Sequence, residues 1–331
     1  MAAEPATLAA LSLGAFAHRL FAAGGRGRVI AAFRRALYVA GPGGMACLGA
    51  PAIGEGPLNV PVAVSAGLDW RALGTGRTVA IDAAGLDVAG GPAVAIAGAA
   101  LWRPPPIVGS GLGRGLAALA VRARPPDEGL GFALPALAGG RPLPPGTTPF
   151  RRAARRGLAA LADWLGAGSR GAPAAAAGLI GLGPGLTPAG DDALGGAMIA
   201  LRGLGRVEAA DRLGAWCLSL AARRTSAIAR AHLAAAAEGE GAAALHAVLA
   251  TLASGDGPEL ARALPALGRL GHSSGWDALA GAVLVLRGLA GGDDPQAELG
   301  GERRAGGDDD ARRLERGALA GIALRVALDP A

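Results

Sequence analysis

The chain has 331 residues, of which 51% are hydrophobic, 3% aromatic and 18% charged, so it is long enough to bury a substantial core or two domains. All 32 basic residues are arginine, and the 26 acidic residues leave a formal net charge of +6. No aromatic side chains interleave with the arginine clusters as in a stacking surface for bases, so we expect no nucleic-acid partner.

No segment predicts export or membrane insertion. The N-terminal stretch carries Glu4 and has no basic region before its apolar residues, unlike a signal peptide. The apolar runs 193–204 and 276–292 contain charged residues and are short for a membrane span. Cys47 and Cys217 lack metal-site spacing, and we expect both to be reduced in a cytoplasmic protein.

The first hundred residues predict a helix followed by strands. Residues 5–23 have helical spacing of apolar residues and end at a Gly-Gly pair. Short apolar runs broken by glycine and proline then predict a small, mostly antiparallel sheet or barrel. The candidate strands are Val29–Val39, Met45–Leu48, Leu58–Val64, Arg77–Ile81 and Ala93–Ile96.

After a Pro/Gly-rich connection, the chain is expected to be helical. We predict α+β, with a small β-rich N-terminal domain (1–102), a Pro/Gly-rich connection (103–147) and an α-helical domain (148–331). Thr148 is the expected N-cap of a helix that Pro149 starts and Gly166 closes. The later helices are expected at Asp191–Leu204, Glu208–Ala222, Ala227–Ala237, Ala242–Ala253, Glu259–Leu267, Trp276–Leu289 and Ala311–Leu328, with a charged, glycine-rich loop at Gly291–Asp310.

Two segments of the helical domain repeat each other. Gly190–Leu204 and Gly275–Leu289 are identical at 10 of 15 positions when aligned without gaps. Each predicts a glycine near a helix N-terminus, an aspartate in the first turn, and then a helix of small apolar residues. The in-register identity predicts that the two N-termini approach each other. Because helix N-termini present N–H groups and partial positive charge, two of them facing one cleft would bind an anion.

The candidate site residues lie in and around these two N-termini. We expect Asp191, Asp192 and His272 to carry catalysis, since His272 lies in a polar turn where an imidazole can donate a proton or bind an anion. The other histidines fall within predicted helices, where packing roles are expected. The candidate anion-binding residues are Gly183, Gly185, Thr187, Gly190, Arg224, Thr225, Ser273, Ser274 and Gly275.

Each of these features also has a purely structural explanation. The glycines can serve only close helix packing, and carboxylates in a first helical turn gain from the helix dipole whatever their function. Paired acids are nevertheless the ligands that Mg²⁺ prefers together with substrate oxygens, so Asp192 and Asp277 are candidate magnesium ligands. The loop does not follow the Rossmann or P-loop spacing.

Several motifs resemble a bacterial family that includes the H subunit of oxamate carbamoyltransferase, from anaerobic allantoin degradation. They are GLGPGLTPAGDD at 181–192, Arg-Thr-Ser at 224–226 and GHSSGWDALAG at 271–281. The segment Ala32–Tyr38 and the turn Gly56-Pro57 are also similar to the opening strands of that family. The similarity spans most of residues 28–290. The chain departs from the family at Ala189 and Ala229, where hydroxyl residues are expected.

The resemblance implies a transferase subunit of purine catabolism that moves a carbamoyl group between carbamoyl phosphate and a small carboxylate such as oxamate. It implies a small anionic substrate and other carbamoyltransferase subunits as partners, and self-association stays open. The residues themselves leave two other functions open. One is a Mg²⁺-dependent hydrolase of a phosphorylated or ribosylated small molecule, and the other is a non-catalytic assembly or regulatory subunit.

Overall fold

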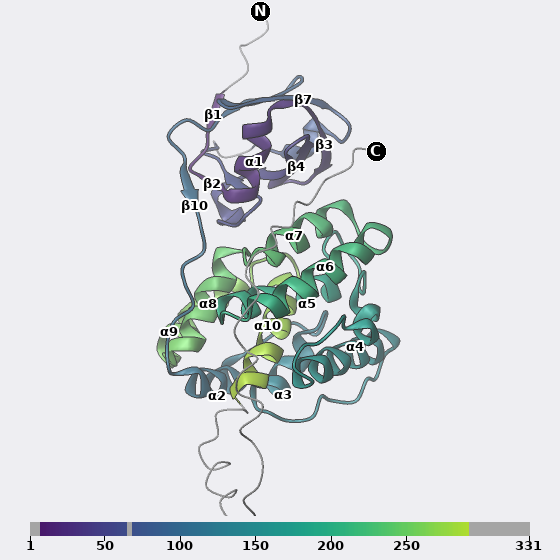
Figure 1. Ribbon diagram of the computed structural model, residues 1–331. Coiled ribbons are helices and arrows are strands. Elements are labelled where there is room, and N and C mark those ends of the chain that lie inside the picture. Colours follow the sequence, from purple (N-terminus) through teal and green to yellow (C-terminus); the bar gives the residue numbers. More distant parts are fainter. Residues whose placement is uncertain (1–6, 65–67, 291–331) are drawn as a thin grey trace, which may run out of the picture. The chain divides into compact units, whose positions relative to one another are not determined.

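The computed structural model describes residues 7–64 and 68–290, in which a strand-rich region precedes a helical region (Figure 1). Ten strands lie between residues 7 and 102, and the long helices of the C-terminal region lie between residues 112 and 290. The predicted α+β class is therefore confirmed. Among the described residues, no helix is both long and apolar enough to cross a membrane.

An eight-stranded sheet forms the N-terminal region. Its order is β1-β9-β8-β7-β3-β4-β5-β6, antiparallel in the middle and parallel at both ends. Ala10, after β1, bridges Val62, after β6, and so joins the two ends of the sheet. The strands are β1 Thr7–Ala9, β3 Gly25–Ala32, β4 Ala36–Gly41, β5 Gly44–Gly49, β6 Asn59–Pro61, β7 Thr78–Asp82, β8 Gly85–Val88 and β9 Ala93–Ala95.

Helix α1 (Ala15–Ala23) supplies the core of this sheet. Leu20 and Phe21 are fully buried on α1, in one apolar cluster with Val39 and Leu48 of the strands. Figure 1 shows α1 in purple against the strands of the same region. Burial of these side chains is the main force that holds helix and sheet together.

The start of the chain differs from the predicted helix over residues 5–23. The structure has β1, then β2 (Ser12–Gly14), and the helix begins only at Ala15. Strand β1 pairs with β9, and β2 pairs with β10 (Ala100–Trp102), so distant partners override the local helical spacing.

The predicted strand Val29–Val39 is also wrong as one element. It is a hairpin of β3 and β4, connected through Phe33–Arg35. Strand β8 has no counterpart among the predicted strands, and the other four predicted strands correspond to β5, β6, β7 and β9.

The helices of the C-terminal region begin and end close to the predicted residues. Thr148 caps α4, because its Oγ1 accepts a hydrogen bond of 3.1 Å from the Arg151 N–H. The predicted Ala311–Leu328 helix and the predicted Gly291–Asp310 loop lie outside the described residues. The helices are α2 Leu112–Arg122, α3 Leu134–Ala138, α4 Pro149–Gly166, α5 Ala189–Gly203, α6 Val207–Arg224, α7 Ala227–Ala237, α8 Ala243–Ser254, α9 Gly257–Leu267 and α10 Ser274–Ala290.

Helices α5 and α10, which contain the two repeats, pack against each other at equivalent residues. A methyl group added at Gly196 would lie 1.8 Å from the Ala278 carbonyl oxygen. One added at Gly281 would lie 1.8 Å from the Ala193 carbonyl oxygen. Since Gly196 corresponds to Gly281 and Ala193 to Ala278 in the repeat, the contact has local two-fold symmetry. The two helix backbones touch where the repeat places its small residues.

Candidate functional site

The carboxylate of Asp191 holds the glycine-rich loop in place. Its Oδ1 accepts a hydrogen bond of 2.9 Å from the Gly181 N–H, and its Oδ2 accepts one from the Thr225 hydroxyl. Gly181 has φ +74°, a conformation that favours glycine. Burial raises the pKa of Asp191, and the bonds from Thr225 and Gly181 oppose that effect. Asp191 therefore ties the loop to the connection between α6 and α7.

Replacing Thr225 by valine tests this tie. The change keeps the shape of the side chain but leaves one oxygen of the Asp191 carboxylate without its donor, so we expect a loss of about 1–2 kcal/mol in the free energy of unfolding. Urea denaturation measures it. Thr78→Val, on the exposed side of β7, is the matched control and should change stability by less than about 0.5 kcal/mol. Equal stability of the two variants would contradict the assignment.

The N-termini of α5 and α10 lie next to each other, as the repeat predicted. Thr187 Oγ1, just before α5, lies 3.0 Å from Ser274 Oγ at the start of α10. Ser226, the N-cap of α7, donates to the Leu186 carbonyl over 2.5 Å. Three helix N-termini and the glycine-rich loop thus meet in one region.

Most backbone N–H groups at these N-termini already have acceptors inside the protein. The Gly190 N–H donates to Leu182 O over 2.9 Å, and those of Asp191 and Asp192 both donate to Pro188 O. At α10, the Gly275 N–H donates to Leu270 O over 3.3 Å. An anion at this position would therefore depend on side chains more than on the helix N–H groups.

The glycines of the loop have conformational and packing roles. Gly183 and Gly185 have φ +115° and +97°, where an L side chain is strained. Gly190 has no room for a side chain, because an added methyl group would lie 2.0 Å from the Leu179 carbonyl oxygen. Arg224, the last residue of α6, donates from its Nη1 to the Ala177 carbonyl over 3.0 Å, which holds the segment just before the glycine-rich loop.

Asp192 and Asp277 occupy equivalent repeat positions but have different surroundings. Asp277 accepts hydrogen bonds from the Leu130 N–H at 2.5 Å and the Ser273 hydroxyl at 2.8 Å. Burial raises the pKa of Asp277 to about 6, although these two bonds oppose the shift. Asp192 Oδ2 is buried and has no hydrogen-bond partner within the described residues.

Burial also raises the pKa of Asp192 well above its ordinary value. The Ser274 and Thr187 hydroxyls act against this shift, whereas the negative charges of Asp277 and Asp191 add to it. The free oxygen and the raised pKa make Asp192 suited to accept a hydrogen bond or a proton from a ligand.

Asp192 opens into a cavity of about 480 Å³ that strands and helices line together. Of the predicted site residues, the cavity brings together Thr187, Asp191, Asp192, Ser274 and Gly275. The following predicted residues do not line it: Gly183, Gly185, Gly190, Arg224, Thr225, His272, Ser273 and Asp277.

His272 lies on a second depression, beside Arg122, Arg124 and Trp276. Its side chain is 79% exposed, and its Nε2 lies 3.6 Å from Glu128 Oε2. The imidazole therefore contacts an acidic neighbour at the surface and does not share the cavity of Asp192.

Sequence reasoning missed several polar residues of the cavity. Tyr38 on β4 and Cys47 on β5 are paired across the sheet and both line it. Burial raises the pKa of the Cys47 thiol to about 12. Burial is also the largest cause of the raised pKa of Tyr38, so both groups stay protonated near neutral pH. The one available signal was that Tyr38, the single tyrosine of the chain, ends the segment Ala32–Tyr38 of the family resemblance.

Helix α7 and three loops contribute further charged and polar residues to the lining. His232, on α7, was expected to be a packing residue, yet it lines the cavity, and burial lowers its pKa to about 4, so the imidazole is neutral. Glu240 follows α7, and Arg35 and Arg269 contribute positive charge from exposed positions. These residues come from segments far apart in sequence, which is why no motif contains them.

The two predicted Mg²⁺ ligands, Asp192 and Asp277, differ in whether protein donors already occupy their oxygens. Both oxygens of Asp277 accept hydrogen bonds from protein donors, as given above. Within residues 7–64 and 68–290 there is no group of three or more His, Cys, Asp or Glu side chains able to hold a metal ion. A Mg²⁺ ion shared by Asp192 and Asp277 together with substrate oxygens stays a prediction from the sequence.

Comparison with protein families matches residues 179–286 to the family described as oxamate carbamoyltransferase subunit AllH. The matched segment runs from the glycine-rich loop into α10 and includes Asp192, His232, Glu240 and Ser274. For this part of the chain, the resemblance seen in the sequence is confirmed. No curated protein and no solved structure matches the chain.

Proposed function

We propose that the chain is a subunit of a cytoplasmic carbamoyltransferase that moves a carbamoyl group between carbamoyl phosphate and a small carboxylate such as oxamate. The observation that carries the proposal is the coincidence of the family match with the cavity: residues 179–286 supply Asp192, whose buried oxygen has no protein partner among the described residues. The cavity is of a size suited to small ligands.

The transfer requires a proton acceptor beside the attacking nitrogen. The amide nitrogen of oxamate attacks the carbonyl carbon of carbamoyl phosphate, a C–N bond forms, the C–O bond to phosphate breaks, and inorganic phosphate leaves. The nitrogen loses one proton in this process. Asp192 is suited to receive it, because a carboxylate with a raised pKa holds a proton more strongly near neutral pH.

Four other cavity residues, two arginines, a tyrosine and a histidine, fit anionic substrates. Arg35 and Arg269 carry permanent positive charge toward phosphate and carboxylate groups. Tyr38, protonated, and His232, neutral, are donors for the oxygen on which negative charge develops. We propose other subunits of the same enzyme as partners, as the family description implies for its members.

Replacing Asp192 by asparagine tests the proposal. We expect carbamoyl phosphate or oxamate to bind to the wild-type chain, and transfer activity to appear when the chain is assembled with its partner subunits. Asp192→Asn should lower activity about tenfold or more, since the amide cannot accept the proton. Wild-type activity should rise with pH as Asp192 ionises, and the variant should lack this rise. Calorimetric titration and release of phosphate are the measurements.

Asp163→Asn, on the exposed face of α4, is the control and should retain full activity. Failure of the wild type to bind either ligand, alone or in the complex, would contradict the proposal. Hydrolysis of a phosphorylated or ribosylated compound by the isolated chain, dependent on added Mg²⁺, would favour the hydrolase. Association with partners without any ligand binding would favour an assembly role.

A further inference from the structure

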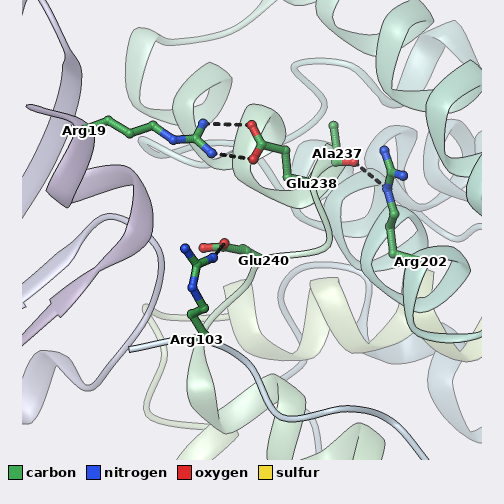
Figure 2. Close-up of polar contacts among 6 residues, drawn as sticks. All are labelled: Arg19, Arg103, Arg202, Ala237, Glu238 and Glu240. Atoms are coloured by element: carbon green, nitrogen blue, oxygen red, sulfur yellow. Dashed lines mark hydrogen bonds and ion pairs between the residues drawn. The ribbon is translucent and has the colours of Figure 1, made fainter. Parts of the chain in front are cut away.

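The connection from α7 to α8 holds two glutamates in fixed positions. Gly239 has φ +87°, and the Glu240 N–H donates to the Ala235 carbonyl over 2.9 Å, which closes the end of α7. Arg202 Nε donates to the Ala237 carbonyl over 2.8 Å, as Figure 2 shows. The backbone that carries the two carboxylates is therefore held by hydrogen bonds on both sides.

The two carboxylates are two residues apart and differ in exposure and pairing (Figure 2). Glu238 is exposed, and both of its oxygens accept hydrogen bonds from Arg19 on α1, at 2.8 and 2.5 Å. Glu240 is only 7% exposed. Its Oε1 lies 3.5 Å from Arg103 Nη1, and its Oε2 has no hydrogen-bond partner among the described residues.

A buried carboxylate oxygen without a donor lowers the stability of the ligand-free protein. Burial is the main cause of a raised pKa at Glu240, and the nearby Glu238 adds to it, while Arg103 and Arg19 oppose it. The Arg103 side chain is 65% exposed and lies at the limit of hydrogen-bond distance, so it compensates weakly. Glu240 therefore contributes little to the fold, yet it lines the same cavity as Asp192.

We propose that Glu240 is a specificity-determining residue of the cavity, whose Oε2 accepts a hydrogen bond from an amide or amino N–H group of the ligand. An ionised carboxylate only accepts hydrogen bonds, so it pairs with an N–H group of a ligand. A ligand with a methyl group in place of the amino group would leave the Glu240 oxygen unpaired. That the donor is the NH₂ group of oxamate or of carbamoyl phosphate rests on the proposed function.

Two pairs of ligands isolate this hydrogen bond. Pyruvate replaces the NH₂ group of oxamate by CH₃, and acetyl phosphate does the same for carbamoyl phosphate. We expect the wild type to bind the NH₂ member of at least one pair about tenfold or more tightly than its methyl analogue. Glu240→Met has a similar length and no acceptor oxygen, so it should bind both members equally. Calorimetric titration of the full chain measures all four ligands.

Glu238→Met is the matched control, and it should keep the preference of the wild type because Glu238 is exposed and paired with Arg19. The melting temperature of each ligand-free variant is the second measurement. Glu240→Met should melt at or above the wild-type temperature, because a buried unpaired oxygen is replaced by an apolar group. A persistent NH₂ preference in Glu240→Met, or a clearly lower melting temperature, overturns the inference.

The two proposals fail in different ways. If the wild type binds none of the four ligands, alone or in the complex with its partner subunits, the proposed carbamoyl transfer is wrong. The melting temperatures then decide the role of Glu240 by themselves. A decrease in Glu240→Met shows a structural role, and an unchanged or higher value supports a different N–H-bearing ligand.

Discussion

Gly196→Ala is expected to destabilise the protein by about 3 kcal/mol or more, although alanine favours helix over glycine by about 1 kcal/mol. The added methyl group would lie 1.8 Å from the carbonyl oxygen of Ala278, a backbone atom that can move only if α5 and α10 separate. Gly281→Ala should cost a similar amount, because it meets the Ala193 carbonyl at the same distance. Urea or guanidinium denaturation measures both.

Gly195 is the control for this prediction. It lies next to Gly196 on the same helix, but a methyl group there would lie 3.5 Å from the Ala236 side chain, an ordinary contact distance. Gly195→Ala should therefore be neutral or stabilising by up to about 1 kcal/mol. If Gly195→Ala and Gly196→Ala have the same effect, the close symmetric contact of the two helices is not as described.

Acidic pH is expected to stabilise the protein through Asp277. The pKa of this carboxyl is about 6 in the folded chain, against an ordinary value of 3.8 that applies to the unfolded chain. Between these two pH values the folded state therefore binds more protons than the unfolded state. Its stabilising contribution is fully present below about pH 4 and is lost as the pH rises through about 6. The slope is at most about 1.4 kcal/mol per pH unit. The raised pKa values of Asp191, Asp192 and Glu240 act in the same direction.

Asp277→Asn isolates the contribution of this residue to the pH dependence of stability. The amide oxygen can still accept from the Leu130 N–H, and the NH₂ group can donate to the Ser273 hydroxyl, so the contacts remain while the titration is lost. Between pH 4 and 7 the stability of the variant should fall less than that of the wild type, as measured by urea denaturation at each pH. The exposed Asp163→Asn should reproduce the wild-type slope. A wild-type slope retained in Asp277→Asn would refute this assignment.

The sequence determined the features that depend on neighbours along the chain. Helical periodicity, Thr148 with Pro149 at the start of α4, and the boundaries of α7 follow from local hydrogen bonding and propensity, and the structure confirms them. The in-register identity of the two repeats also predicted that the N-termini of α5 and α10 approach each other, and the contact of Thr187 with Ser274 confirms it.

Tertiary structure decided which residues share the cavity. Tyr38, His232 and Glu240 lie on β4, on α7 and after α7, and no spacing along the chain expresses their proximity. The same limit explains the start of the chain, where pairing of β1 with β9 overrides helical spacing.

The two repeated aspartates show most clearly what the sequence predicts and what only the structure decides. Asp192 and Asp277 are equivalent in sequence, so the repeat assigns them one role. In the structure Asp277 receives two hydrogen bonds, from Leu130 and Ser273, whereas Asp192 keeps a buried oxygen free beside the cavity. The donors that make this difference belong to segments outside the repeat or to its flanking turn. Protonation and binding are set by such contacts in space, and only the folded chain brings them together.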